Sequence, residues 1–223
     1  MNGAESLVRT LKLGGINVCF TNPGTSEMHF MAALDRTNAM RCVLGLQENV
    51  VTGMADGYAR IADKPAATLL HLGPGLANGL SNLHNASKAG TGIINIVGDH
   101  ATYHLKHNAP LTSDIEGIAR PVSDWIRTSP LAKDIATDGA EAIRQASTHP
   151  GRIATLILPG DTAWNEGADP ILATQPNPPA APSVKKIEEA VHALSNGKRT
   201  GIFLKGPTLR EPGLTLAGKI AAK

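Results

Sequence analysis

Aromatic residues are scarce in this sequence, since Phe, Trp and Tyr together make up only 3% of its 223 residues. Hydrophobic residues nevertheless reach 42%, so aliphatic side chains must fill the core, and charged residues are limited to 18%. A chain of this composition is expected to fold rather than to stay disordered. The 23 glycines and 15 prolines suit a fold with many tight connections between elements.

A dominant charge is also lacking, because the formal net charge is only +2. The basic residues are scattered, so neither nucleic acid nor an anionic membrane surface is an expected partner. No apolar run approaches the roughly 18 residues that a membrane span needs. The first 15 residues lack the apolar core and cleavage site of a secretory signal. We therefore expect a cytoplasmic protein that does not interact with membranes.

Cysteine occurs only twice, at Cys19 and Cys42. Both residues lie in short apolar runs that are typical of buried strands. We expect two buried free thiols in a reducing compartment rather than a disulfide.

Short apolar runs alternate with segments of helical periodicity along most of the chain. The runs predict strands at 18–20, 41–44, 66–72, 93–97 and 153–158. The intervening periodicity predicts helices at 3–14, 26–37, 48–62, 76–88 and 137–147. Residues 100–128 are less regular and predict a long loop with a short helix. This alternation is typical of βαβ units, so we expect an α/β fold whose parallel sheet is covered by helices on both faces.

Proline crowds into residues 168–183, where no periodicity is found, and this composition predicts an interdomain linker. We divide the chain into a first domain at 1–165, a Pro-rich linker at 166–183 and the start of a second α/β domain at 184–223. The last segment predicts a helix capped by Ser183, a strand at 201–204 and a further helix. One strand and two helices cannot close a core, so we expect an incomplete central domain and the front part of a longer protein.

Three connections that follow predicted strands carry candidate binding residues, at 22–25, 46–48 and 71–75. In open parallel sheets, ligands bind at the carboxyl ends of strands near helix N-termini. Glu48 opens a predicted helix there, although a carboxylate in a first turn can serve only to complement the helix dipole. His71 ends a strand and would project toward the same crevice, although a single histidine there is often structural.

Two other patterns suggest different chemistry. Gly73-Pro74-Gly75 with Gly79 follows a strand and precedes a helix, and Asp99 lies twenty residues further on. This pattern resembles the phosphate loop of an NAD-dependent oxidoreductase. The glycine spacing is one residue too long, and Pro74 lacks the N–H that a phosphate cradle needs.

The second pattern is the spacing of His100, His104 and His107, which is compatible with metal ligation. The surrounding sequence is irregular and contains Pro110, which favours a surface loop. We expect no metal ligands among these residues.

The motifs at 20–27, 46–48, 56–60 and 72–75 together resemble the N-terminal, pyrimidine-binding domain of thiamine-diphosphate (ThDP) enzymes. The similarity is to benzoylformate decarboxylase and to acetolactate synthase large subunits, and it covers residues 1–165. The eight-residue step from Glu48 to the Asp-Gly-Tyr-Ala-Arg motif is its most specific feature.

The resemblance implies that Glu48 binds the aminopyrimidine ring of ThDP and promotes the tautomer that deprotonates the thiazolium ring. It places the other contacts to the cofactor at Asn22, Pro23, Gly24 and Gly73.

The resemblance also implies that Thr25 and His71 face a 2-keto acid substrate, as a hydroxyl and a histidine do in the decarboxylase branch. With Glu48, these are the expected catalytic residues. His71 favours decarboxylase or lyase chemistry over an acetolactate synthase proper.

One part of the family pattern is missing. No Gly-Asp-Gly motif for Mg²⁺ is present, since neither Gly98-Asp99-His100 nor Gly160-Asp161-Thr162 matches it. Mg²⁺ and the diphosphate are therefore expected to bind through a missing C-terminal domain, and the chain alone should be inactive. The expected partner is a second copy of the chain, in a homo-oligomer, or a separate diphosphate-domain chain. Binding of FAD is left open, and so are an NAD-dependent oxidoreductase and a non-catalytic regulatory module.

Overall fold

The computed structural model describes residues 1–223 as two compact units, Met1–Pro176 and Asn177–Lys223. Each unit is described by itself. None of the helices combines the length and the apolar character that crossing a membrane requires.

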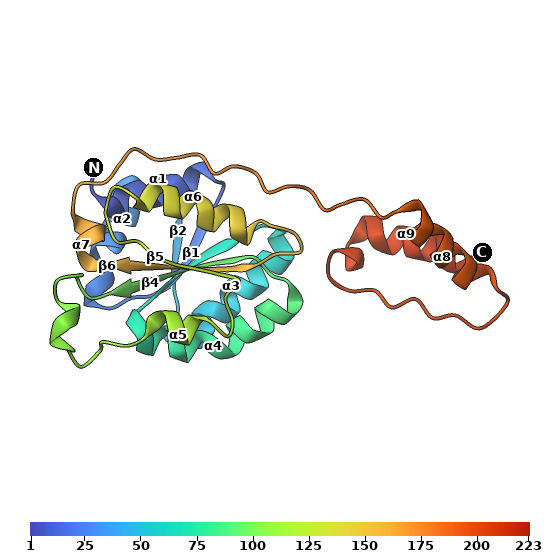
Figure 1. Cartoon of the computed structure of the whole chain (residues 1–223), viewed down its shortest axis with the longest axis horizontal. Helices are drawn as coiled ribbons and strands as arrows, with labels where there is room; N and C mark the ends of the chain where they lie inside the picture. Colours follow the sequence, from blue (N-terminus) through green and yellow to red (C-terminus); the bar gives the residue numbers. More distant parts are fainter. The chain divides into compact units, whose positions relative to one another are not determined.

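The first unit contains a six-stranded sheet in which every neighbouring pair of strands is parallel (Figure 1). The strand order is β2-β1-β3-β4-β6-β5. The chain runs outward from β1 to β2 and then crosses back to β3 on the other side of β1, which creates a topological switch point between β1 and β3. The strands are β1 (Val18–Asn22), β2 (Arg41–Leu44), β3 (Ala66–Leu70), β4 (Ile93–Asp99), β5 (Trp125–Thr128) and β6 (Ile153–Pro159).

Helices cover both faces of this sheet (Figure 1). One face packs against α1 (Gly3–Leu13), α2 (Met28–Thr37) and α6 (Ile135–Ala146). The other packs against α3 (Glu48–Ala62), α4 (Leu72–Ala89) and α5 (Ile115–Ala119). The short helices η1 (Thr25–Glu27), η2 (Leu105–His107) and α7 (Gly160–Trp164) complete the unit. The predicted α/β class, with a parallel sheet between two helical layers, is confirmed.

Sequence signals explain where most of these elements begin and end. The strands β3, β4 and β6 are buried along their whole length, which matches their continuous apolar runs. The side chain of Asn2 accepts a hydrogen bond from the N–H of Glu5 and caps α1. Asp63 and Gly90 end α3 and α4 in the left-handed conformation, with φ angles of 56° and 66°.

A buried polar row crosses the middle of the sheet. Thr68, Asn95 and Thr155 are register partners on β3, β4 and β6, and all three are fully buried. The Thr68 hydroxyl donates to the Asn95 side-chain oxygen at 2.9 Å, and the Asn95 amide donates to Thr155 at 3.2 Å. Ser123 completes the row at 2.7 Å from Thr155. Because a one-residue slip would bury these groups without partners, the row fixes the register of the three strands.

Two predictions for the first unit were incomplete. Residues 100–128 contain a sixth strand, β5, which is only four residues long and half-exposed at the sheet edge, so its apolar signal is weak. The helix expected at 76–88 begins at Leu72 instead, so Gly73-Pro74-Gly75 forms its first turn and not a loop. Pro is tolerated there because the first turn leaves its N–H groups without helical partners.

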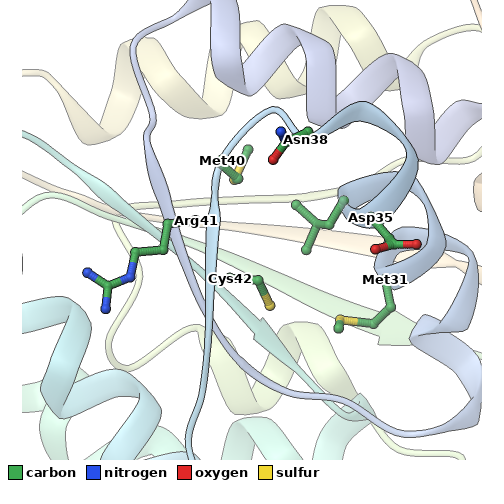
Figure 2. Close-up of a pocket in the computed structure, with 7 residues that line it drawn as sticks. Met31, Asp35, Asn38, Met40, Arg41 and Cys42 are labelled. Carbon is green, nitrogen blue, oxygen red and sulfur yellow. The ribbon is translucent and has the colours of Figure 1, made fainter.

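Both cysteines are free, but the expectation that both are buried was wrong for Cys42. Cys19 lies on β1 in the core, whereas Cys42 lies on the edge strand β2, which has a neighbour on only one side. Figure 2 shows Cys42 beside Met31 and Asp35 of α2, in a shallow pocket, with Arg41 directed the other way.

The second unit contains α8 (Val184–Ser195), η3 (Gly206–Leu209) and α9 (Glu211–Ala221). The Ser183 hydroxyl caps α8 as expected, accepting from the N–H of Lys186 at 3.4 Å. The strand predicted at 201–204 is absent, because the unit offers no second strand to pair with, and Phe203 there is 94% exposed. Of the segment predicted as a linker, residues 166–176 belong to the first unit, where Ala173 is buried.

We expect Asn95→Leu to lower the free energy of unfolding by about 1–3 kcal/mol, because the buried Thr68 hydroxyl loses its acceptor. Adding Thr68→Val should recover part of that loss, since no orphaned hydroxyl then remains. Urea unfolding of the two single variants and the double variant measures this coupling. Strictly additive effects would contradict a role for the polar row.

Candidate functional site

The carboxyl ends of β1, β3 and β4 meet at the switch point of the sheet, where ligands bind in open α/β folds. Four connections leave the sheet at this edge, and all of them carry polar residues. They are residues 22–27 after β1, 45–48 after β2, 71–75 after β3 and 98–100 around the end of β4.

Glu48 is the first residue of α3 and is half-buried. Its Oε2 accepts a hydrogen bond at 3.1 Å from the side-chain amide of Asn78, on the second turn of α4. Its Oε1 makes no hydrogen bond within the chain and lies 3.5 Å from the point where a Cβ on Gly75 would stand. One carboxylate oxygen is thus held in place while the other is left available.

Close contact between α3 and α4 holds Glu48 in this position. The Thr52 hydroxyl bonds to the carbonyl of Gly79 at 3.0 Å, and the Asn82 amide donates to the carbonyl of Asn49 at 2.6 Å. A Cβ on Gly79 would stand 2.9 Å from a Thr52 methyl group. Gly79 is therefore needed for helix packing, and not for binding a phosphate as the dinucleotide hypothesis required.

His71 lies at the junction of β3 and α4, close to Gly75 as Glu48 is. A Cβ on Gly75 would stand 3.4 Å from the Cβ of His71 and 3.5 Å from Oε1 of Glu48. The Nδ1 of His71 is 2.8 Å from Oε2 of Glu27, a carboxylate that is only 2% exposed. The backbone N–H of Gly24 donates to that same oxygen at 2.7 Å.

The remaining predicted site residues occupy different positions. Gly24 lies directly against the imidazole of His71, so that a side chain would collide with the ring. Asn22 donates to the carbonyl of Gly45 at 2.8 Å and ties the β1 and β2 connections together, next to the half-buried Pro23. Thr25 is exposed at the start of η1 and makes no hydrogen bond to Glu48 or His71. Gly73 packs against the Ser113 side chain.

The first turn of α4 is poorly suited to a pyrophosphate. Pro74 has no N–H, and the N–H of Gly75 already donates to the carbonyl of His71 at 2.8 Å. The carboxylate of Glu48 beside Gly75 would also repel a phosphate. The geometry thus gives no support to the NAD-dependent alternative.

His100, His104 and His107 form a short stack, with ring centroids 5.4 and 5.3 Å apart and the planes tilted. Their rings contact one another and do not direct three nitrogens at a common point. No group of three or more His, Cys, Asp or Glu side chains in the structure is arranged to hold a metal ion.

Asp99, at the end of β4, is a second buried carboxyl at this edge. Burial raises the pKa of Asp99 above the usual range. The backbone N–H and the imidazole of His100 lower this pKa in part, and the nearby Glu27 carboxylate raises it further. The His100 N–H donates to Asp99 at 2.7 Å. Buried acidic groups of this kind often accompany functional sites.

Sequence reasoning missed Glu27. Glu27 belongs to the motif at residues 20–27, but its position predicted only an ordinary acidic residue in the first turn of a helix. Its burial and its bond to His71 arise from the packing of β1, β3 and β4, which no local pattern reveals.

Residues 1–118 match the family described as thiamine pyrophosphate enzyme, N-terminal TPP binding domain. Thiamine pyrophosphate is the same compound as ThDP. The chain belongs to this family.

Named relatives agree with this assignment. A Mycobacterium tuberculosis protein with the provisional name acetolactate synthase large subunit IlvX is 51% identical over 220 residues, which cover 99% of this chain and 42% of that protein. Benzoylformate decarboxylase of Pseudomonas aeruginosa is 29% identical over 202 residues, covering 88% of this chain and 38% of that protein. The chain thus spans about two fifths of the length of these relatives.

A solved structure shows the same fold. The ThDP-dependent 4-hydroxybenzoylformate decarboxylase of Rhodococcus jostii RHA1 superposes with a TM-score of 0.79 and 23% identity. The match covers 88% of this chain and 38% of that one. The two chains therefore share the fold of this domain.

We expect Asp99→Asn to stabilise this domain at neutral pH. A carboxyl whose pKa rises on folding keeps its proton more tightly when folded, so its ionisation lowers stability as pH rises above the unfolded value of about 3.9. Asparagine avoids this cost and keeps an oxygen for the His100 N–H. The difference in Tm between variant and parent should therefore grow from about pH 4 to about pH 7.

Thermal unfolding at both pH values checks this expectation. Glu166→Gln, at an exposed carboxyl, is the matched control and should give a difference that changes little with pH. An Asp99→Asn effect that is constant, or that shrinks as pH rises, would contradict the assignment of Asp99 as a carboxyl with a raised pKa.

Proposed function

We propose that this chain is the pyrimidine-binding part of a ThDP-dependent 2-keto acid decarboxylase or carboligase. The observation that carries the proposal is the carboxylate of Glu48 at the switch-point edge, with Oε2 held by Asn78 and Oε1 without a partner. The names of the relatives, acetolactate synthase and benzoylformate decarboxylase, support this reaction class.

The residues present fit the aminopyrimidine end of the cofactor. A ring nitrogen needs a carboxyl oxygen that is fixed in direction and free of other bonds, and Oε1 of Glu48 meets both conditions. Gly75 adds no side chain where Oε1 of Glu48 and the Cβ of His71 approach each other, so the oxygen is not covered there. When bound, ThDP supplies a nucleophilic carbon and an electron sink for decarboxylation.

Glu48 and His71 are proposed to divide the proton handling. Glu48 would hold a proton toward the pyrimidine ring, since Asn78 orients its carboxylate and the rigid α3–α4 contact keeps it in place. His71, close to the same Gly75, would act on the substrate. Thr25 would contribute its exposed hydroxyl to a bound substrate, and Asn22 with Pro23 and Gly24 would shape the cofactor-binding edge.

The chain is proposed to need a partner for activity. Leu46, two residues before Glu48, is 89% exposed, and Leu44 and Val50 nearby are also exposed. Apolar side chains that surround a site in this way favour cover by another polypeptide surface. We propose that a second copy of the chain or a diphosphate-domain polypeptide covers them, and that the diphosphate-domain polypeptide would supply the Mg²⁺ ligands.

The test is isothermal titration of ThDP with Mg²⁺ into this chain, alone and after mixing with the C-terminal remainder of the M. tuberculosis relative. We expect binding only in the mixture. Glu48→Gln should weaken it by roughly 10- to 100-fold, as expected for the loss of a charge-assisted hydrogen bond of about 1.5–3 kcal/mol. Glu166→Gln, at an exposed carboxyl, should bind like the parent chain.

Three other outcomes would each contradict part of this proposal. Binding in the mixture that Glu48→Gln leaves unchanged would remove Glu48 from the site. No binding of ThDP in either arm would favour a regulatory module that keeps the fold without the chemistry, and heat released on adding NAD would revive the dinucleotide alternative.

A further inference from the structure

Glu27 has an unusual environment for a carboxylate. It is 2% exposed, yet it has no lysine or arginine partner among the ion pairs of the structure. Its Oε2 accepts from the N–H of Gly24 and contacts Nδ1 of His71, while its Oε1 is buried without a hydrogen-bond partner. Burying a carboxylate with so few partners is unfavourable for stability, which points to a functional reason for its presence.

The imidazole of His71 is fixed on one edge and open on the other. Glu27 and Gly24 occupy the edge that carries Nδ1. Nε2 makes no hydrogen bond within the chain, and 24% of the His71 side chain remains exposed. The carboxylate therefore binds one ring nitrogen and leaves the other available at the site.

Two glycines make this arrangement sterically feasible. A side chain on Gly24 would collide with the His71 ring, and a side chain on Gly98 of β4 would collide with Oε1 of Glu27. The carboxylate of Glu27 thus lies against the end of β4, where only a glycine leaves space for it.

The backbone next to His71 is strained in the same region. Leu72 is fully buried and adopts a φ angle of +48°, which is unfavourable for a bulky residue. This conformation occurs where the chain passes from β3 into α4, one residue after His71.

We propose that Glu27 is a positioning residue that holds His71 as the Nδ1–H tautomer and presents Nε2 to the substrate. The Nδ1–H donates to Oε2 of Glu27, so the lone pair of the neutral ring lies on Nε2, where it can take up a proton and return it. The role of Nε2 in the reaction rests on the proposed function above, whereas the tautomer of His71 does not.

The test is long-range ¹H–¹⁵N NMR of the chain with labelled histidines, with the His71 signals assigned by their loss in His71→Gln. In the parent chain we expect Nδ1 to carry the proton in the neutral ring. Glu27→Met has a similar size but offers no acceptor, so the major tautomer should change to Nε2–H. Glu27→Gln keeps an acceptor oxygen and should retain the Nδ1–H form, and Glu166→Gln should leave the His71 signals unchanged.

Gly98→Ala provides a second route that keeps the carboxylate in the chain. Its methyl group should displace Glu27 and shift the population toward Nε2–H, as Glu27→Met does. If either variant keeps the amide spectrum of a folded chain and still shows the parent tautomer, the proposal is overturned. A tautomer change together with absent ThDP binding would support the role of Glu27 and count only against the proposed function.

Discussion

The parallel pairing of β1, β3 and β4 is the constraint on which the rest of the site depends. Because the three strands run in the same direction, their following connections leave the sheet at one edge, and the crossover from β2 to β3 makes that edge a switch point. The register is held by the buried row of Thr68, Asn95 and Thr155 in the sheet interior. A slip between β3 and β4 would shift Gly98 of β4, which lies against Glu27, relative to His71 at the end of β3.

Small residues then convert this shared edge into a defined geometry. Gly79 lets α4 approach α3, which fixes Glu48, and Gly24 and Gly98 leave room for the contact between His71 and Glu27. Gly75 adds no side chain beside Glu48 and His71. Glu48 and Glu27 thus lie at one edge with different surroundings. Glu48 is half-buried with a free oxygen, and Glu27 is buried and bound to an imidazole.

The sequence was informative where a local pattern determines the structure. Alternating apolar runs and helical periodicity were sufficient for the α/β class, and the cap at Ser183 was correctly predicted. Local patterns failed where packing decides. The half-exposed β5 carries little apolar signal, the 201–204 segment has no strand to pair with, and Cys42 is exposed only because β2 is an edge strand. Gly79 resembled a phosphate-loop residue because close helix packing and phosphate binding both require glycine.

We propose that the aminopyrimidine ring binds against the carboxylate of Glu48, close to Gly75. A ¹H–¹⁵N NMR titration of this chain with 4-amino-5-hydroxymethyl-2-methylpyrimidine tests this, because the compound has the ring but no diphosphate and so needs no partner domain. We expect shifts centred on the amides of Glu48, Gly75 and Asn78 in the parent chain, and their loss in Glu48→Gln. Shifts confined to the pocket around Cys42, or no shifts at saturating ligand, would contradict it.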